Sequence, residues 1–259
     1  MDAVPAPPST PSSSTIEEVL EVLLLCFEAA ADVFPNARFA YAEPERKDAA
    51  GMSCYCVWST EDLMYEAPSV LPTTFPPAGV PEATARMNMC DSFAWLLEAE
   101  ADKKLQEYFG AKALWTIVKP VPRFLLLREG MPYQAEIPAH SVLVVTQSDG
   151  SQHIMDGTPV QFGWPRSSWL LPANVFSAQR MVPNTNVVMS HHERLIFDQE
   201  MRPLNKGFWG MAQDTMRELF GELDWNALFV LPRSQRAEVV KEQAEKKFAG
   251  VWRLGPQVE

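Results

Sequence analysis

The first part of the chain begins polar and then becomes strongly apolar. Residues 1–15 are rich in proline, serine, alanine and threonine and almost uncharged, which predicts a disordered tail. Thr15 and Glu18 then have the spacing of a capping box, in which a hydroxyl and a carboxylate satisfy each other's backbone N–H groups. The leucine-, valine- and alanine-rich run that follows predicts a helix from residue 16 to about Phe34.

Prolines separate this helix from the next one. The stretch 66–82 holds five prolines and is predicted to be an extended connection, because proline disfavours the helical conformation in the residue before it. A second apolar pattern at helical spacing predicts a helix from about Met89 to Phe109, ended by Gly110.

Short apolar runs then replace the helical pattern. They predict four strands in quick succession, over 113–119, 123–129, 140–147 and 152–158. Helical spacing returns over 208–224 and 234–252. This order of elements predicts an α+β fold. We expect a single domain over 16–259, in which an antiparallel β-sheet packs against a central helix with a cysteine at its N-terminus, with extra N- and C-terminal helices.

Composition and charge narrow the possible partners. The 259 residues are 47% apolar and include 8 tryptophans, which is enough for one sizeable core. The net charge is −11 and the pI about 4.9, with no Lys/Arg-rich stripe, so nucleic acid and membrane surfaces are not expected partners. The N-terminus lacks the pattern of a signal peptide, and the apolar run interrupted by Glu21 and Glu28 is too short to span a bilayer. We therefore expect a cytoplasmic protein, of open oligomeric state.

The four cysteines are expected to be thiols, as in other proteins of a reducing compartment. Cys54 and Cys56 are separated by one residue rather than two and lack the second Cys or His pair of a zinc site, so no structural metal and no cofactor is expected. Cys26, preceded by leucines within a helical pattern, is interpreted as a small hydrophobic residue of the core.

Cys90 falls in the first turn of the second predicted helix. Asn88 is a good N-cap, and Asp91 three residues later completes a pattern similar to a capping box. The unsatisfied N–H groups and the positive end of the helix dipole favour a thiolate at this position. Helical spacing places Cys90 on an inward face with Phe93 and Leu97. A thiol nucleophile and a small hydrophobic core residue are the two interpretations.

A thiol nucleophile needs an imidazole within hydrogen-bond reach, and the strand pair over 140–158 contains two histidines. The register of this hairpin decides between them. Residues 148–150 fit a type I turn followed by a glycine bulge, which places Gln147 opposite Ser151.

In this register the two histidines lie on opposite faces. Because side chains alternate along a strand, His140 shares a face with Asp156 on the neighbouring strand, within side-chain reach. His140 is therefore the preferred base, with Asp156 to orient it. His153 is interpreted as a surface or second-layer residue, although a slip of one residue would exchange the two roles.

Cys90, His140 and Asp156, in this order, resemble the transglutaminase-like superfamily of thiol enzymes, whose layout is similar to that of papain-like enzymes. The family pattern is a cysteine that starts a helix with small and aromatic residues, here MCDSFAWLL, then a histidine that opens a strand, then a strand that ends in an Asp-x-Thr turn. The segment HSVLVVTQSDGSQHIMDGTPVQF matches the second half, with sixteen residues from the histidine to the aspartate. The resemblance covers about residues 85–165, the expected catalytic core.

The resemblance implies that Cys90 is the nucleophile, His140 the general base and acid, and Asp156 the orienting carboxylate. Asn88-Met89 replaces the usual Gly or Trp before the nucleophile, so the oxyanion-hole donors beyond the Cys90 backbone N–H stay open. The Arg-Gly-Gly-x-Cys motif of arylamine acetyltransferases and the zinc-binding cysteine pairs of peptide N-glycanases are absent from the sequence. The branch of the superfamily therefore stays open.

The expected function is thiol-dependent acyl transfer or amide hydrolysis through a cysteine thioester. The substrate is expected to be a small-molecule or peptide amide or thioester, and water and an amine both stay open as acceptors. Four tryptophans are candidates for a water-excluding wall, with a place in the core as their alternative: Trp58, Trp95, Trp164 and Trp169.

Two other functions compete with this one. The first is a catalytically inactive transglutaminase-like domain that serves as a binding or scaffold module. The second is a metal enzyme that uses His191, His192 and nearby carboxylates. Because these histidines are adjacent rather than four residues apart, a polar loop or a helix start is the simpler interpretation.

Overall fold

The computed structural model describes residues 15–34, 39–43, 45–48, 50–59, 79–128 and 137–254. The predicted tail over 1–15, except Thr15, and most of the proline-rich connection over 66–82 lie outside these ranges. The end of that connection is helical rather than extended, because helix α3 spans Val80–Ala85 with a proline in its first turn. Proline is tolerated there, where its missing N–H would have had no intrahelical acceptor.

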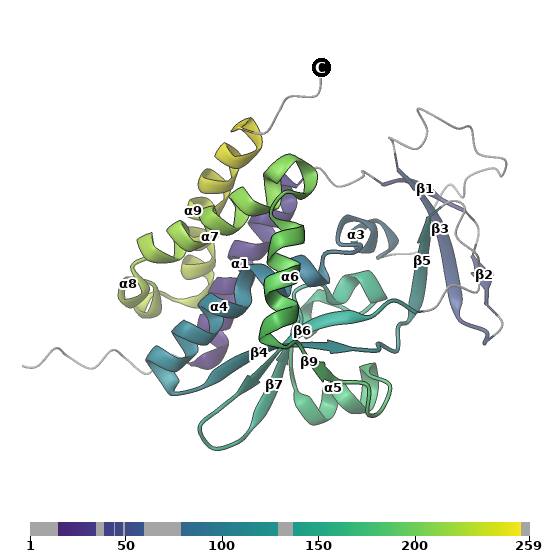
Figure 1. Cartoon of the computed structure of the whole chain (residues 1–259), viewed down its shortest axis with the longest axis horizontal. Helices are drawn as coiled ribbons and strands as arrows, with labels where there is room; N and C mark the ends of the chain where they lie inside the picture. The colour runs from purple at the N-terminus through teal and green to yellow at the C-terminus, as the bar shows by residue number, and fades with distance from the viewer. Residues whose placement is uncertain are drawn as a thin grey trace, which may run out of the picture.

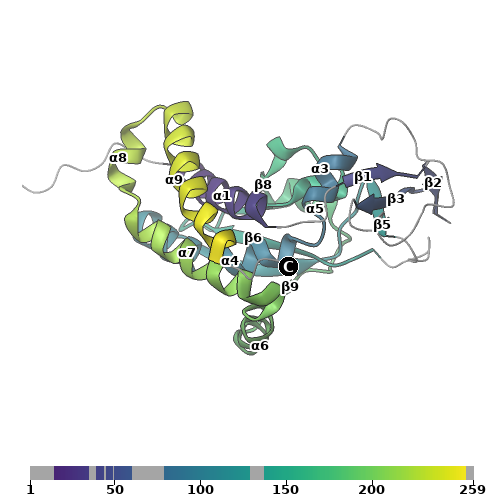
Figure 2. The same cartoon turned by 90° about the horizontal axis from the view of Figure 1, so that it is seen from above.

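A layer of helices forms one side of the molecule (Figure 1 and Figure 2). The helices of this layer contact one another directly: α1 (Ile16–Val33), α4 (Cys90–Phe109), α7 (Phe208–Glu222) and α9 (Arg233–Leu254). The predicted capping box is confirmed, because the Glu18 N–H and the Thr15 N–H each donate to the other residue's side chain. Shorter helices α6 (His191–Met201) and α8 (Trp225–Val230) flank the layer.

The main sheet has five strands in the order β8-β7-β6-β4-β9, all paired antiparallel, as predicted for the core sheet. Its strands are β4 (Lys112–Val118), β6 (His140–Thr146), β7 (Gln152–Met155), β8 (Leu170–Pro172) and β9 (Val187–Val188). Helix α4 packs against β4 and β6, so the predicted central helix lies directly on the sheet.

The two faces of the sheet carry different clusters. Leu143, Val145 and Met155 point into the large core with the helical layer. Val142 and Ile154 point to the opposite face, where they meet aromatic side chains and helix α5 (Ala173–Arg180). This alternation is the one that strand geometry predicts for the β6–β7 hairpin.

A smaller sheet lies at the other end of the molecule (Figure 1). It contains β1 (Phe39–Ala42), β2 (Arg46–Lys47), β3 (Ser53–Ser59) and β5 (Phe124–Arg128). The strand over 123–129 was predicted to belong to the antiparallel sheet with its neighbours in sequence, and this was wrong. It forms β5, which pairs parallel with β3 in the smaller sheet. Pro120 and Pro122 follow β4 and cannot donate to a sheet ladder, so the chain leaves the main sheet there.

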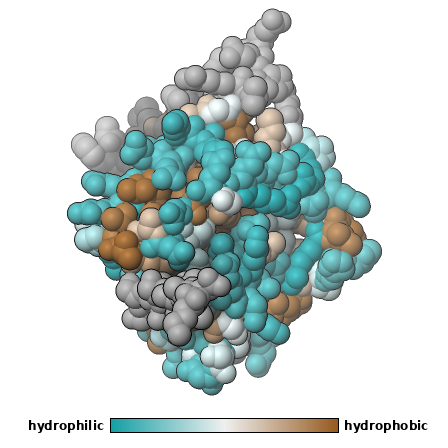
Figure 3. Space-filling view, turned by 90° about the vertical axis from the view of Figure 1, so that its left-hand side faces the viewer, coloured by the Kyte–Doolittle hydropathy of each residue, from teal (hydrophilic) through white to brown (hydrophobic). Residues whose placement is uncertain are grey.

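The outer surface of the helical layer is mostly hydrophilic, with smaller hydrophobic patches between the polar side chains (Figure 3). Exposed apolar side chains include Val230 of α8 and Leu204 of the 3-10 helix η3 (Leu204–Gly207). Within the described ranges, every helix is too short or too polar to cross a lipid bilayer.

Candidate active site

Cys90 is the first residue of α4 and so lies in its first turn, as the sequence predicted, but the helix start is built differently. Met89 is the N-cap and makes no side-chain capping bond, while Asn88 has a φ of 61° in the left-handed region. Asparagine tolerates this conformation better than most residues, so it makes the turn into the helix instead of capping it. The first hydrogen bond of the helix runs from the Phe93 N–H to the Met89 carbonyl, at 2.9 Å. The Cys90 N–H comes before this bond and therefore has no acceptor within the helix.

The predicted capping role of Asp91 was also wrong. Its carboxylate accepts a short hydrogen bond from the Ser141 hydroxyl, which in turn accepts from the Trp115 indole N–H at 2.8 Å. The same carboxylate oxygen lies 4.0 Å from the Cys90 sulfur. Asp91 thus ties the start of α4 to strand β6 through Ser141.

His140 opens strand β6 and is completely buried. Its Nε2 lies 3.0 Å from Oδ2 of the equally buried Asp156. The N–H of Nε2 does not point along a good hydrogen-bond direction to this oxygen, so the contact is best described as an ion pair. Cys90 also lies close enough to the imidazole to contribute to its pKa. The three residues that the sequence singled out are therefore brought together.

The hairpin register agrees with the prediction. Leu143 pairs with Met155, and the Gln147 N–H donates to the Ser151 carbonyl at 2.9 Å. The ladder between β6 and β7 ends at Met155, and one residue later the Asp156 N–H donates to the Trp169 carbonyl at 2.7 Å.

Asp156 is held by its own turn as well. Its Oδ1 accepts from the Thr158 N–H at 2.9 Å, which leaves Oδ2 for His140. Gly157 lies between them because the Phe93 ring of α4 fills the space where a side chain would be: a Cβ at position 157 would lie 2.1 Å from that ring. The glycine therefore lets α4 approach the carboxylate closely.

Sequence reasoning did not single out Gln161, which belongs to the site. This residue lies on the 3-10 helix η1 (Pro159–Phe162) and is buried. Its amide nitrogen is 3.1 Å from His140 Nδ1 and 2.8 Å from the Thr158 hydroxyl oxygen. The only signal in the sequence was the QF dipeptide after the Asp-Gly-Thr turn. Gln161 therefore contacts the imidazole at Nδ1, while Asp156 contacts it at Nε2.

Aromatic rings enclose the imidazole on the face of the sheet opposite α4. The Phe162 ring is 4.7 Å and the Trp164 ring 5.9 Å from the His140 ring, both in edge-on arrangements. Of the four candidate tryptophans, Trp164 packs against the histidine. The others serve elsewhere: Trp58 donates to Glu43, Trp95 donates to Asp198, and Trp169 packs in the main core.

The charge of the imidazole follows from these surroundings. Burial by itself acts to lower the pKa of His140, but the negative charge of Asp156 and a smaller contribution from Cys90 outweigh it and raise the pKa to about 10. The raised pKa favours the imidazolium form of His140. A thiol enzyme uses such a cation to stabilise the thiolate and later to donate a proton.

The space next to the thiol is small. Cys90 and Gln161 line a cavity of about 40 Å³, walled by apolar groups that include Leu125, Leu126 and Phe162. Such a volume holds only a few water molecules.

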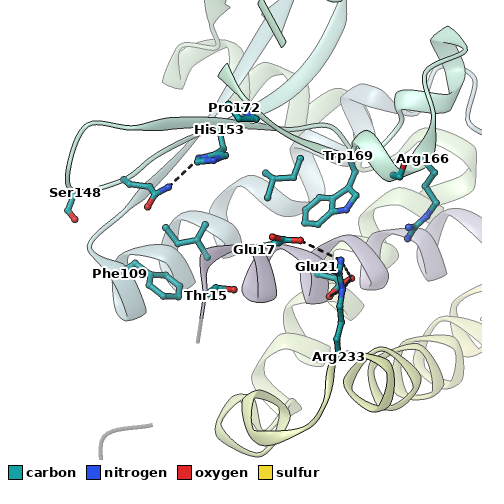
Figure 4. Close-up of a pocket in the computed structure, with 14 residues that line it drawn as sticks. Thr15, Glu17, Glu21, Phe109, Ser148, His153, Arg166, Trp169, Pro172 and Arg233 are labelled. Atoms are coloured by element: carbon teal, nitrogen blue, oxygen red, sulfur yellow. Dashed lines mark hydrogen bonds and ion pairs between the residues drawn. The ribbon is translucent and has the colours of Figure 1, made fainter. Parts of the chain in front are cut away.

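His153 lies away from this site, as expected from strand parity. It is half-buried, and its Nδ1 lies 3.2 Å from the Gln147 amide nitrogen. It lines an open cavity of about 940 Å³ between the hairpin and α1, which also holds Arg166 and Arg233 (Figure 4). The cysteine, histidine and aspartate of the candidate site do not line this larger cavity.

The adjacent histidines His191 and His192 begin helix α6. Ser190 and Glu193 form its capping box, so Glu193 is used in the helix start. The described ranges contain no group of three or more His, Cys, Asp or Glu side chains placed to bind a metal ion.

Cys90, His140 and Asp156 place a buried imidazole, paired with a carboxylate, near a sulfur at a helix start, which is the set of groups that thiol chemistry requires. Comparison with protein-family models, curated proteins and solved structures gave no match to the chain.

Proposed function

We propose that the protein is a thiol-dependent acyltransferase or amide hydrolase of the transglutaminase-like type, acting through a Cys90 thioester. The observation that carries the proposal is the buried His140, which makes an ion pair with Asp156 at one nitrogen and lies close enough to the Cys90 thiol for that thiol to affect its pKa. A satisfied core histidine needs neither a carboxylate partner nor a thiol at a helix start.

In the first half-reaction the Cys90 thiolate attacks the carbonyl carbon of an amide or thioester. The carbonyl electron pair moves to the oxygen and returns as the bond to the leaving amine or thiol breaks. His140, an imidazolium at this stage, protonates the leaving group from Nδ1, because Nε2 is held by Asp156, and the Gln161 amide turns away from Nδ1 for this step. The product is the acyl-enzyme and a neutral imidazole.

In the second half-reaction water or an amine gives a proton to His140 and attacks the thioester carbonyl. The Cys90 thiolate leaves and the imidazolium is restored, so no other reactant is required. The substrate is proposed to be a small-molecule or peptide amide or thioester, and the choice of acceptor stays open. Because all four cysteines are thiols, we propose that the reaction takes place in the reducing cytoplasm.

Gln161 is suited to two tasks in this cycle. With neutral His140, its amide N–H can donate to Nδ1. With the imidazolium, the amide turned by 180° presents its oxygen to the Nδ1–H, and its N–H₂ faces away. Because Gln161 and Cys90 line the same cavity, we propose the amide as an oxyanion donor beside the Cys90 backbone N–H.

The small cavity favours the second candidate, a catalytically inactive binding or scaffold domain. A volume of about 40 Å³ does not hold an acyl group together with its leaving group. Catalysis therefore requires the apolar wall of the cavity to move when substrate binds, whereas a scaffold does not.

Covalent trapping separates the two candidates. The full-length protein is incubated with a panel of activated esters, thioesters and amides, and peptides are mapped by mass spectrometry. We expect an acyl adduct on Cys90, none in Cys90→Ala, and an unchanged adduct in Cys26→Ala, the matched control on α1. A folded protein that accepts no donor at Cys90 would favour the scaffold instead.

A further inference from the structure

Arg180 is a buried cation that the proposed mechanism does not use. It is the last residue of α5 and only 7% exposed. Its guanidinium carbon lies 4.8 Å from the centroid of the Trp164 ring, a cation–π contact, and its Nη1 donates to the Ser168 carbonyl at 3.3 Å. A buried arginine on the aromatic face of the sheet is costly, so its surroundings indicate what it stabilises.

The first connection to the active site runs through the aromatic rings. Arg180 covers Trp164, whose ring packs edge-on against His140 and lies 5.2 Å from the Phe162 ring. The Phe162 ring packs on the same imidazole at 4.7 Å. Arg180 therefore fixes the outer side of the wall that encloses His140.

The second connection runs through the backbone. Arg180 donates to Ser168, the last residue of the 3-10 helix η2 (Arg166–Ser168). The next residue, Trp169, accepts the N–H of Asp156 at 2.7 Å through its carbonyl. One side chain thus anchors both the ring that packs on His140 and the segment that holds Asp156.

The third connection is electrostatic. Burial lowers the pKa of Arg180, whereas the charge of Asp156 acts to raise it and the charge of Arg123 acts to lower it. Three groups face His140: Asp156 in the loop after β7, Cys90 on α4 and the neutral Gln161 on η1. Asp156 therefore makes an ion pair with the imidazole and is also within electrostatic range of the guanidinium.

We propose that Arg180 is a positioning residue: it holds the His140–Asp156 pair in place through Trp164 and the Ser168–Trp169 segment, and it takes up part of the Asp156 charge so that His140 can release its proton. The catalytic part of this statement rests on the proposed function. The effect on the imidazole exists whether or not the protein is an enzyme.

Two substitutions separate charge from packing. Arg180→Met keeps the aliphatic stem and removes the charge, and Arg180→Lys keeps the charge but loses the flat stack on Trp164. Arg217→Met is the matched control, because Arg217 is half-exposed on α7 and pairs with Asp214. The His140 ring is followed by NMR from neutral to alkaline pH in each full-length protein.

In Arg180→Met we expect His140 to hold its proton to a pH about one unit higher than in the wild type, because Asp156 then has one cation fewer. In Arg180→Lys we expect the His140 titration of the wild type. Iodoacetamide should alkylate Cys90 about tenfold more slowly in this variant, because the aromatic wall around His140 is packed less tightly. Arg217→Met should match the wild type in both measurements.

An unchanged His140 titration in Arg180→Met would overturn the electrostatic part, and an unchanged alkylation rate in Arg180→Lys would overturn the positioning part. If Arg180→Met does not fold, Trp164→Phe, which weakens the cation–π contact, replaces it and should also slow alkylation. Failure of the proposed function looks different: Cys90 would be unreactive in the wild type, while the His140 titration would still respond to Arg180.

Discussion

The β6–β7 hairpin carries two histidines in contrasting surroundings. His140, at the start of β6, is fully buried and contacts a carboxylate, an amide, a thiol and two aromatic rings. His153, on β7, is half-buried beside an open cavity and has a neutral amide at its Nδ1 (Figure 4). The two residues have the same chemistry and lie in the same hairpin, so the difference between them comes from the face of the sheet to which each one points.

This difference shows that alternation along a strand sets the face to which each histidine points, but not the groups that other elements bring to it. Alternation along the strand places His140 on the face of Asp156 and His153 on the other face. Activation of His140 needs more: the start of α4, which brings the thiol, and the loop after β7, which brings Asp156, Gln161 and Trp164. The predictions below change His140 or its partners, and two of them use His153 or its partner Gln147 as the reference.

The largest expected effect is on the rate of Cys90 acylation. We predict that His140→Asn slows acylation by about 10²–10⁴-fold, the usual contribution of a general acid–base group. His153→Asn should stay within about twofold of the wild type, as a substitution outside the site. The rates are measured with the best acyl donor at neutral pH. Equal losses in the two variants would remove the distinction between the histidines.

The next effect is on the pH dependence of stability. The pKa of His140 is raised to about 10 in the folded protein, above its ordinary value of about 6.5. The protonated imidazole therefore stabilises the fold fully below pH about 6.5, and this stabilisation is lost as the pH rises through about 10. The free energy of unfolding, wild type minus His140→Asn, should fall by up to about 1.4 kcal/mol per pH unit in this window.

Urea unfolding at a series of pH values measures this slope. Asp156→Asn is the control, because it removes the charge that raises the pKa of His140 and should flatten the curve. A slope that persists in Asp156→Asn would mean that another group is responsible.

The smallest effect compares the amide partners of the two histidines. Gln161→Ala leaves the Thr158 hydroxyl and His140 Nδ1 without this buried partner and should cost about 1–3 kcal/mol of unfolding free energy. Gln147→Ala, beside His153, should stay within about 0.5 kcal/mol of the wild type. Denaturant unfolding of both variants measures the contrast, and equal costs would contradict it.

The sequence was sufficient for features that depend on local spacing. The capping box at Thr15, the helix from Cys90 to Phe109 and the hairpin turn over 148–150 are set by residues a few positions apart. The hairpin turn fixed the register, and the register paired His140 with Asp156.

Features that depend on distant parts of the chain were not predictable. Strand β5 finds its partner in β3, about seventy residues earlier, and periodicity says nothing about that pairing. Gln161 and Arg180 lie in a short 3-10 helix and at a helix end, where no apolar pattern marks a side chain as inward. Asn88 was misassigned because the same residue type suits both an N-cap and a left-handed turn.

The most direct test compares the two helical thiols Cys90 and Cys26 in one experiment. Burial raises the pKa of Cys26, in the middle of α1, whereas Cys90 lies at a helix start beside the His140 imidazolium. The protein is treated with iodoacetamide at neutral pH, and both cysteine peptides are quantified over time by mass spectrometry. We predict that Cys90 is alkylated at least about tenfold faster than Cys26, and that His140→Asn abolishes this advantage. Alkylation of Cys90 no faster than that of Cys26 would contradict its assignment as the nucleophile.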